Sequence, residues 1–341
     1  MPERQKLHCE ESEIIVGCAG NGQKLPQVFA PPEIPDISRI DMSVDLAGVT
    51  LKNPVVVASG TFGFGREYSR FFDLSELGGI CCKGLTLHRR EGNPPPRIAE
   101  TPMGILNSVG LQNPGVDAFI AHELPFLRQH DVKVIANISG NSPEEYGIMC
   151  EKLSAAGADM IEVNISCPNV KAGGLAYGTR PDLAAEVTKL AKSHATVPVM
   201  VKLSPNVTDI TEIAKAVADA GADALSLINT LRGMRIDVYT RRPILKMNTG
   251  GLSGPAVLPV AVRMVWEVAS AVKLPILGMG GVSTGGDAAQ LMLAGASAVA
   301  VGTALFADPY APLKVRDGLS EIATTQGMNT VRELTSSVKP W

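Results

Sequence analysis

The chain has 341 residues, of which 45% are hydrophobic, so it can bury a large core as one barrel-sized domain or as two smaller domains. Its formal net charge of −3 at pH 7, with the two signs interspersed, gives no indication of nucleic-acid binding. No apolar run approaches the roughly 20 residues of a membrane-spanning helix, and the polar start is unlike a secretory signal, so we expect a soluble cytoplasmic protein.

The first segment of the chain, residues 1–37, is charged at its start and rich in proline towards its end. This composition predicts a mobile N-terminal tail, for which the sequence indicates no role. A single domain is predicted over residues 38–341.

Six cysteines lie at positions 9, 18, 81, 82, 150 and 167, without C-x-x-C spacing. Neither a zinc site nor an iron–sulfur cluster is therefore predicted in this chain. Free thiols are typical of a reducing compartment.

Short apolar runs bounded by turn residues alternate with helix-like segments from residue 55 onwards. The predicted strands are 55–59, 79–83, 134–139, 160–166, 199–204, 224–230, 276–281 and 298–303. The predicted helices are 67–77, 116–129, 143–156, 181–193, 209–220, 256–271, 286–294 and 312–325. A hairpin formed by 42–46 and 49–52 is predicted to close the bottom of this fold. Eight strands alternating with eight helices predict an α/β fold, the (β/α)8 TIM barrel.

A short motif recurs between a predicted helix and the next predicted strand. It reads Ala-Gly-Ala-Asp at 156–159 and 220–223, and Ala-Gly-Ala-Ser at 294–297. Glycine can cap the helix there, and alanine allows close packing against the sheet. The repeat supports the barrel and says nothing about a substrate.

Polar and charged residues gather at the ends of the predicted strands. They are Ser59, Lys83, Asn137, Asn164, Cys167, Lys202, Asn229 and Thr230. In an α/β barrel these strand ends meet at one rim, where the chemistry takes place. A buried lysine is unfavourable unless it faces an anion, so we expect Lys83 and Lys202 to face one shared pocket.

The segment 162–169, EVNISCPN, is the most informative strand end. A lone cysteine is most often a small buried hydrophobic residue. Here Asn164, Ser166 and Asn169 surround Cys167 with hydrogen-bonding side chains, which favours a reactive thiol. Pro168 stiffens the turn, and the glycine-containing segment 170–178 is predicted to be a mobile lid.

Three glycine-rich turns are predicted at the same rim. They are 250–254 (GGLSG), the turn containing Gly280 and Gly281, and the turn containing Gly302 and Thr303. Turns of this kind bind phosphate through backbone N–H groups, so a phosphorylated cofactor is expected. Two long connections, 86–115 and 231–254, are predicted to form hairpins that cover the mouth and exclude water.

Several motifs together resemble the catalytic subunit of dihydroorotate dehydrogenase, class 1, over residues 42 to about 312. They are LNSVGLQNPG at Leu106, NISCPN at Asn164, VKLSPN at Val201, NTLRGM at Asn229 and GGLSGPA at Gly250. Class 2 members of that family have a serine base and a membrane-binding N-terminal segment, and neither is found in this chain. GNPPPRIAET at 92–101 and the segment 170–178 are most similar to the NAD-linked subtype, class 1B.

The resemblance implies roles for individual residues. Cys167 would take a proton from C5 of dihydroorotate while a hydride leaves C6 for N5 of FMN. The substrate-binding residues would be Lys83, Asn107, Ser108, Val109, Gly110, Leu111, Asn164, Asn229 and Thr230. The FMN-binding residues would be Ser59, Lys83, Gly84, Asn137, Asn164, Lys202, Ile228, Gly254, Gly280, Gly281, Gly302 and Thr303. A cation such as Lys202 beside the flavin would stabilise the anion formed on reduction.

The resemblance also implies a partner, because the sequence has no dinucleotide-binding G-x-G-x-x-G turn and no cysteine cluster. A second subunit carrying FAD and a [2Fe–2S] cluster would pass electrons to NAD⁺, and this chain would form a homodimer within a heterotetramer. Three alternatives stay open: a fumarate-dependent class 1 enzyme, a dihydropyrimidine dehydrogenase-like flavoenzyme, and a non-catalytic phosphate-binding barrel.

Overall fold

The fold is a closed eight-stranded barrel in a computed structural model that describes residues 40–166, 177–339 and 341. The strands run parallel, and their order around the barrel follows the chain. They are β3 (Val55–Val57), β4 (Gly79–Cys81), β7 (Lys133–Ile138), β8 (Met160–Asn164), β9 (Val199–Lys202), β10 (Ala224–Leu227), β15 (Ile276–Met279) and β16 (Ala298–Val301). Nearly every strand residue is buried, as expected for strands packed on both faces. The predicted TIM barrel is confirmed.

Each of these strands ends one or more residues before its predicted end. The polar residues that follow, such as Ser59 and Lys83, lie in loops because the parallel pairing has already stopped. The polar residues do follow the strand ends as predicted, but the predicted strands were too long.

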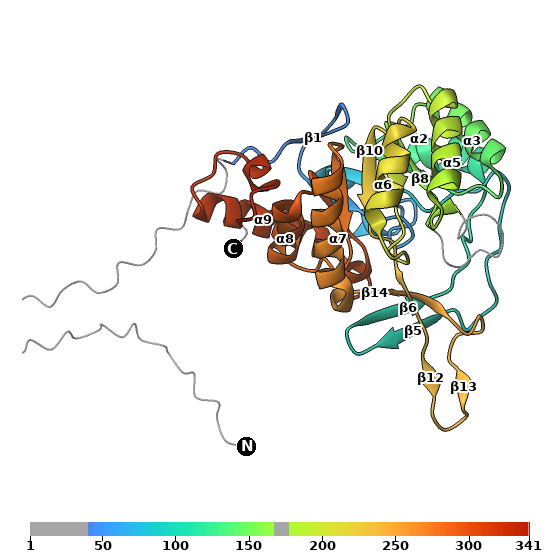
Figure 1. The fold of residues 1–341 in the computed structure, drawn as a ribbon. Coiled ribbons are helices and arrows are strands. Elements are labelled where there is room, and N and C mark those ends of the chain that lie inside the picture. The colour runs from blue at the N-terminus through green and yellow to red at the C-terminus, as the bar shows by residue number, and fades with distance from the viewer. Residues whose placement is uncertain (1–39, 167–176, 340) are drawn as a thin grey trace, which may run out of the picture. The chain divides into compact units, whose positions relative to one another are not determined.

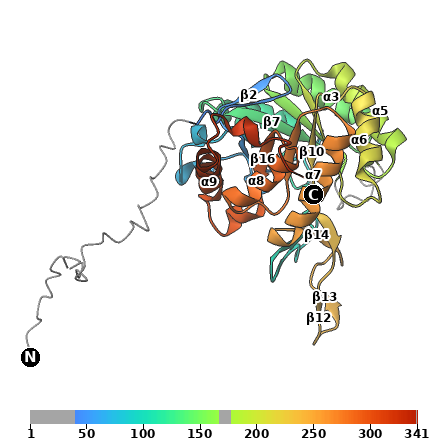
Figure 2. The same ribbon diagram turned by 60° about the vertical axis from the view of Figure 1, so that its left-hand side comes forward.

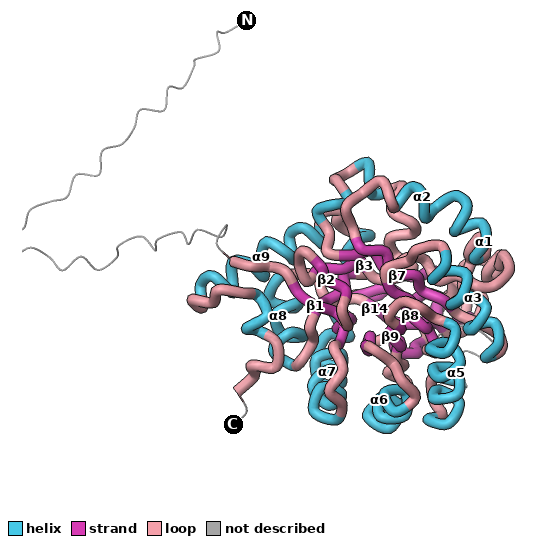
Figure 3. The backbone as a smooth tube through the Cα atoms, turned by 90° about the horizontal axis from the view of Figure 1, so that it is seen from above, coloured by secondary structure: helices cyan, strands magenta, loops and turns pink. Residues whose placement is uncertain are grey.

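Helices surround the barrel in a ring (Figure 3). The longer ones are α3 (Pro143–Ala155), α5 (Pro181–His194), α6 (Ile210–Asp219), α7 (Leu258–Ala271), α8 (Gly285–Ala294) and α9 (Ala311–Thr325). Their starts have local causes: Asp209 caps α6 through Thr211 N, and Thr284 with Asp287 forms a capping box at α8. In the described part of the chain no helix is long and apolar enough to cross a membrane.

Two predicted helices were wrong in detail. Residues 67–77 form two short 3₁₀ turns, η2 (Tyr68–Arg70) and η3 (Leu74–Glu76). Between them Asp73 adopts an extended conformation and accepts a hydrogen bond from Ser75 N, which begins a new turn. Residues 116–129 are helical but divided into α1 (Val116–Ala118), a π-helical turn (Phe119–Glu123) and α2 (Leu124–Leu127). Pro125 has no N–H to continue a regular helix there.

The recurring Ala-Gly-Ala motif forms the predicted turns. Gly157, Gly221 and Gly295 have φ values of 88°, 99° and 129°, which glycine adopts readily. The carboxylates of Asp159 and Asp223 accept hydrogen bonds from N–H groups at the start of adjacent strands, Val134 N at 2.8 Å and Val199 N at 2.7 Å. The two copies that end in aspartate therefore tie their helix ends to the barrel.

A separate sheet lies at the end of the barrel opposite the β1–β2 hairpin (Val44–Leu46 and Val49–Leu51) (Figures 1 and 2). It contains β5 (Ile98–Thr101), β6 (Gly104–Asn107), β11 (Leu231–Gly233) and β14 (Gly250–Ser253), in the order β11-β14-β6-β5. The two long connections form hairpins as predicted, because β5 pairs with β6 and β11 pairs with β14. β6 also pairs with β14, so the two connections build one sheet. A small hairpin, β12 (Ile236–Asp237) with β13 (Arg242–Pro243), projects beyond it.

Candidate functional site

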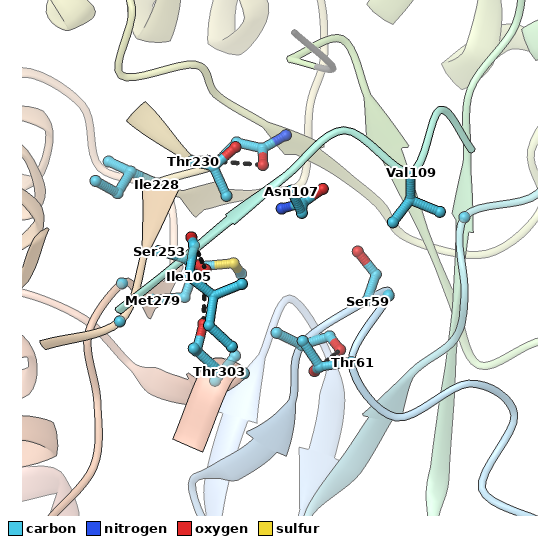
Figure 4. A pocket seen from close by; sticks show the side chains of 18 of the residues that line it. Ser59, Thr61, Ile105, Asn107, Val109, Ile228, Thr230, Ser253, Met279 and Thr303 are labelled. Atoms are coloured by element: carbon cyan, nitrogen blue, oxygen red, sulfur yellow. Dashed lines mark hydrogen bonds between the residues drawn. The ribbon is translucent and has the colours of Figure 1, made fainter. Parts of the chain in front are cut away.

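A cavity of about 350 Å³ lies where the carboxyl ends of the barrel strands meet the four-stranded sheet. This size falls within the range of small-molecule sites. Asn107 enters from β6, Ser253 from β14, and Ser59 and Thr61 from the loop after β3 (Figure 4). The sheet therefore forms one wall of the cavity, and the strand ends form the rest.

Most of the residues predicted to bind substrate or cofactor line this cavity. They are Ser59, Lys83, Gly84, Asn107, Val109, Gly110, Leu111, Asn137, Asn164, Lys202, Ile228, Asn229, Thr230, Gly254, Gly280, Gly281, Gly302 and Thr303. Both lysines thus face one pocket, as expected.

Two of the predicted site residues are not placed in the cavity. Ser108 is fully buried and does not line it; its N–H donates to Arg97 O at 2.8 Å, and its carbonyl accepts from Asn93 Nδ2 at 2.9 Å. Cys167 lies outside the described residues, as does most of the predicted lid at 170–178.

The floor of the site contains a buried ion pair. Lys202 Nζ lies 3.8 Å from Glu162 Oε2, and the side chains are 5% and 0% exposed. Lys202 also approaches Ser59 Oγ at 3.5 Å. Glu162 was missed as a site residue, although an acidic residue within the apolar run 160–165 was a usable signal. Such a residue requires a buried partner, and Lys202 is that partner.

Glu162 accepts hydrogen bonds from three further side chains. Cys81 Sγ lies 3.0 Å from Oε2, Ser226 Oγ lies 2.6 Å from Oε1, and Asn137 Nδ2 also donates to Oε2. Burial by itself would raise the pKa of Glu162, but Lys202 and these donors outweigh it and hold that pKa below its usual value. The carboxylate is therefore ionised, and the floor carries one negative and one positive charge.

The residue just before Cys167 is held firmly. Asn164 Oδ1 accepts from Ser166 N at 3.1 Å and from Ser166 Oγ at 2.9 Å. Asn229 Nδ2 donates to the same hydroxyl at 2.8 Å. Two cavity-lining asparagines thus fix the point from which the chain continues to Cys167.

The three described cysteines, Cys81, Cys82 and Cys150, are buried free thiols. Burial raises the pKa of Cys150 to about 12, and it raises the pKa values of the other two as well. None of them lines the cavity. These thiols are therefore poor bases, and they are structural residues of the core.

The glycine-rich turns come together as predicted. A Cβ atom on Gly281 would lie 2.8 Å from Leu258 N and 3.0 Å from Gly254 O, so only glycine permits this approach. Thr303 Oγ1 donates to Ser253 Oγ at 2.8 Å and links the third turn to β14 (Figure 4). The resulting backbone cradle suits a phosphate group.

The cavity also presents polar side chains that suit a polar ligand. Asn137 Oδ1 is buried and has no hydrogen-bond partner among the described residues, although its Nδ2 is bonded to Glu162. A buried acceptor of this kind requires a donor from a ligand. With Lys202, which also lines the cavity, the site presents an acceptor and a cation in addition to the phosphate cradle. The described residues include no cluster able to hold a metal ion.

Comparison with known proteins gives a consistent result. The family model described as dihydroorotate dehydrogenase matches residues 41–323. The chain is 60% identical over 270 residues to a protein of Geobacillus kaustophilus, covering 79% of this chain and 86% of the relative. It is 56% identical over 298 residues to one of Alkaliphilus oremlandii, covering 87% and 99%. Both relatives are named dihydroorotate dehydrogenase B (NAD(+)), catalytic subunit.

Proposed function

Since this chain belongs to the dihydroorotate dehydrogenase family, we propose that it is the catalytic subunit of an NAD⁺-linked enzyme that oxidises dihydroorotate to orotate in pyrimidine biosynthesis. The observation that carries the proposal is one cavity lined by four asparagines, two lysines and three glycine turns. These side chains are Asn107, Asn137, Asn164, Asn229, Lys83 and Lys202.

FMN is the proposed cofactor. Enzymes of this family are flavin-dependent, and bound FMN supplies the hydride acceptor. The turns at Gly254, Gly281 and Gly302 would hold its single phosphate. Asn137 and Lys202 would hold the polar end of the ring, where the unpartnered Asn137 Oδ1 can accept a hydrogen bond from a ring N–H. Lys202 would also stabilise negative charge that develops there on reduction.

The substrate would be held mainly by amide side chains. Dihydroorotate presents imide donors and acceptors, which the side chains of Asn107, Asn164 and Asn229 complement. Lys83, which also lines the cavity, would supply positive charge for the anionic substrate. Ile105 from β6 adds an apolar surface that helps to exclude water.

Cys167 is the proposed base. As its thiolate takes the proton from C5, the hydrogen on C6 leaves with its electron pair, and the C5–C6 double bond forms. The hydrogen bond that Asn164 accepts from Ser166 N and the one that Asn229 donates to Ser166 Oγ would fix the backbone next to this thiol. The three described cysteines, Cys81, Cys82 and Cys150, are unsuitable, because burial raises their pKa values.

The electrons would then reach NAD⁺ through a partner subunit carrying FAD and a [2Fe–2S] cluster. The word "subunit" in the names of the relatives supports a partner. We propose a homodimer of this chain with one partner on each copy, working in the cytoplasm.

The test begins with the purified chain. Mass spectrometry of the released cofactor should give FMN, and anaerobic dihydroorotate should bleach the flavin absorbance, whereas uracil should not. NAD⁺ should be reduced rapidly only after the partner subunit is added. Bound FAD, no flavin at all, or full activity with fumarate and without a partner would overturn the proposal.

A further inference from the structure

A carboxylate lies at the centre of the barrel, where apolar residues are usual. Glu162 is 0% exposed, and its side chain contacts residues from four other strands: Cys81 from β4, Asn137 from β7, Lys202 from β9 and Ser226 from β10. Replacing a buried ion pair by apolar residues is often neutral or stabilising, so stability alone does not account for this charge. A role in the adjacent site does account for it.

Two of the four partners reach the cavity. Asn137 and Lys202 line it, whereas Cys81 and Ser226 do not. Because Asn137 donates its Nδ2 to Glu162, the orientation of its amide is fixed, and its Oδ1 is left for a ligand. Gly84 adjoins this oxygen, since a Cβ there would lie 2.7 Å from Oδ1. Glu162 is thus in contact with two cavity-lining groups, the Asn137 amide and the Lys202 ammonium.

We propose that Glu162 is a positioning residue for the flavin reaction. It aligns the Asn137 amide and offsets the charge of Lys202, and the Glu162–Lys202 ion pair thereby sets the midpoint potential of the bound flavin. This inference rests on the proposed function. It concerns a residue that does not itself line the cavity.

The direction of the effect follows from charge. Reduction places negative charge on the flavin, which Lys202 stabilises. The Glu162 carboxylate weakens this stabilisation by offsetting the charge of the lysine. Replacing the carboxylate by an uncharged amide leaves the ammonium uncompensated. The reduced state is then favoured, and the midpoint potential rises.

The test is Glu162→Gln in the FMN-loaded protein, titrated anaerobically against a reference dye. We expect the ratio of reduced to oxidised flavin at a fixed potential to rise at least tenfold, about 30 mV for a two-electron couple. Ser226→Ala is the matched control, because it removes a hydrogen bond from the same carboxylate but leaves its charge. We expect it to change the ratio less than about twofold. Equal shifts in the two variants would mean a merely structural network and would overturn the proposal.

A double-mutant cycle with Lys202→Met tests whether Glu162 acts through the lysine. On that background Glu162→Gln should change the ratio by less than about twofold, and an undiminished shift would contradict the proposed route.

If Glu162→Gln does not fold, Glu162→Asp serves in its place, with a smaller shift of the same sign and weaker FMN binding expected. A wild-type midpoint potential together with wild-type FMN affinity in Glu162→Asp would overturn the inference. If the wild-type protein itself binds no flavin, the proposed function is overturned instead.

Discussion

Removing the charge of Lys202 should destabilise the protein even when no flavin is present. Lys202→Met keeps an unbranched side chain of similar length but deletes the ammonium that lies 3.8 Å from Glu162. The carboxylate is 0% exposed, so water cannot take over the role of the lysine. The variant therefore contains a buried charge without a counter-ion.

The size of the effect follows from the geometry. At 3.8 Å and an effective dielectric constant of about 20, the attraction between the two charges is about 4 kcal/mol. Breaking a buried pair on one side typically costs about 3–5 kcal/mol. Glu162 keeps its hydrogen bonds from Cys81, Asn137 and Ser226, so we expect a loss of about 3–4 kcal/mol near neutral pH.

The loss should depend on pH in a defined direction. In the wild type, folding lowers the pKa of Glu162. The ionised carboxylate therefore contributes to stability above the pKa of the unfolded chain, about 4.3, and this contribution disappears as pH falls through the pKa of the folded protein. In Lys202→Met, burial without the cation should raise the folded pKa above that of the unfolded chain. The variant then gains stability relative to the wild type as pH falls, and the difference between them should shrink towards about pH 5.

Urea unfolding of flavin-free protein, followed by circular dichroism near neutral pH and near pH 5, measures both effects. The double variant Lys202→Met with Glu162→Gln is the decisive control, because it removes the unpaired charge and should recover more than half of the lost stability. A loss below about 1 kcal/mol, or a double variant no more stable than the single one, would refute the reasoning.

Three further predictions concern catalysis and cofactor binding. Cys167→Ala should slow flavin reduction by dihydroorotate at least about 100-fold in stopped-flow experiments with FMN still bound, and a wild-type rate would exclude Cys167 as the base. Cys167→Ser should keep weak activity that rises at high pH. Gly281→Ala should weaken FMN binding at least about tenfold in a fluorescence titration, because Gly281 has a φ of 82° and a Cβ there would lie 2.8 Å from Leu258 N. The control Gly48→Ala, at a position with a φ of 83° but no atom within 4 Å of the added Cβ, should bind FMN normally. Asn229→Ala should raise KM for dihydroorotate about tenfold and leave FMN affinity unchanged, and an unchanged KM would remove Asn229 from the substrate site.

The barrel could be predicted from the sequence because its signals are local. Each strand is a short apolar run, and the helix starts at Asp209 and Thr284 depend on neighbours within three residues. The two wrong helix predictions also have local causes. Asp73 interrupts the helix predicted at 67–77, and Pro125 follows a π-helical turn in the helix predicted at 116–129. The helical pattern of apolar residues indicated neither interruption.

Contacts between distant segments could not be predicted in the same way. The pairing of β6 with β14 joins residues more than a hundred positions apart, and neither segment carries a pattern that specifies the other. The partners of Glu162 come from four strands, so the run MIEVNI indicated only that a buried acid needed some partner. The residues lining the cavity were predicted more fully, because a barrel brings all its strand ends to one rim.

The position of Glu162 on β8 connects the barrel core with its chemistry. Side chains two residues apart on a strand point to the same face, so Glu162 and the cavity-lining Asn164 both point into the barrel, one layer apart. Cys81, Glu162 and Ser226 come from alternate strands, β4, β8 and β10, as the members of one barrel layer do. The layer beneath the cavity is therefore polar, whereas an apolar layer would pack the barrel equally well. Because this polar layer contacts the cavity through Asn137 and Lys202, its cost to stability is best understood as a requirement of the site above it.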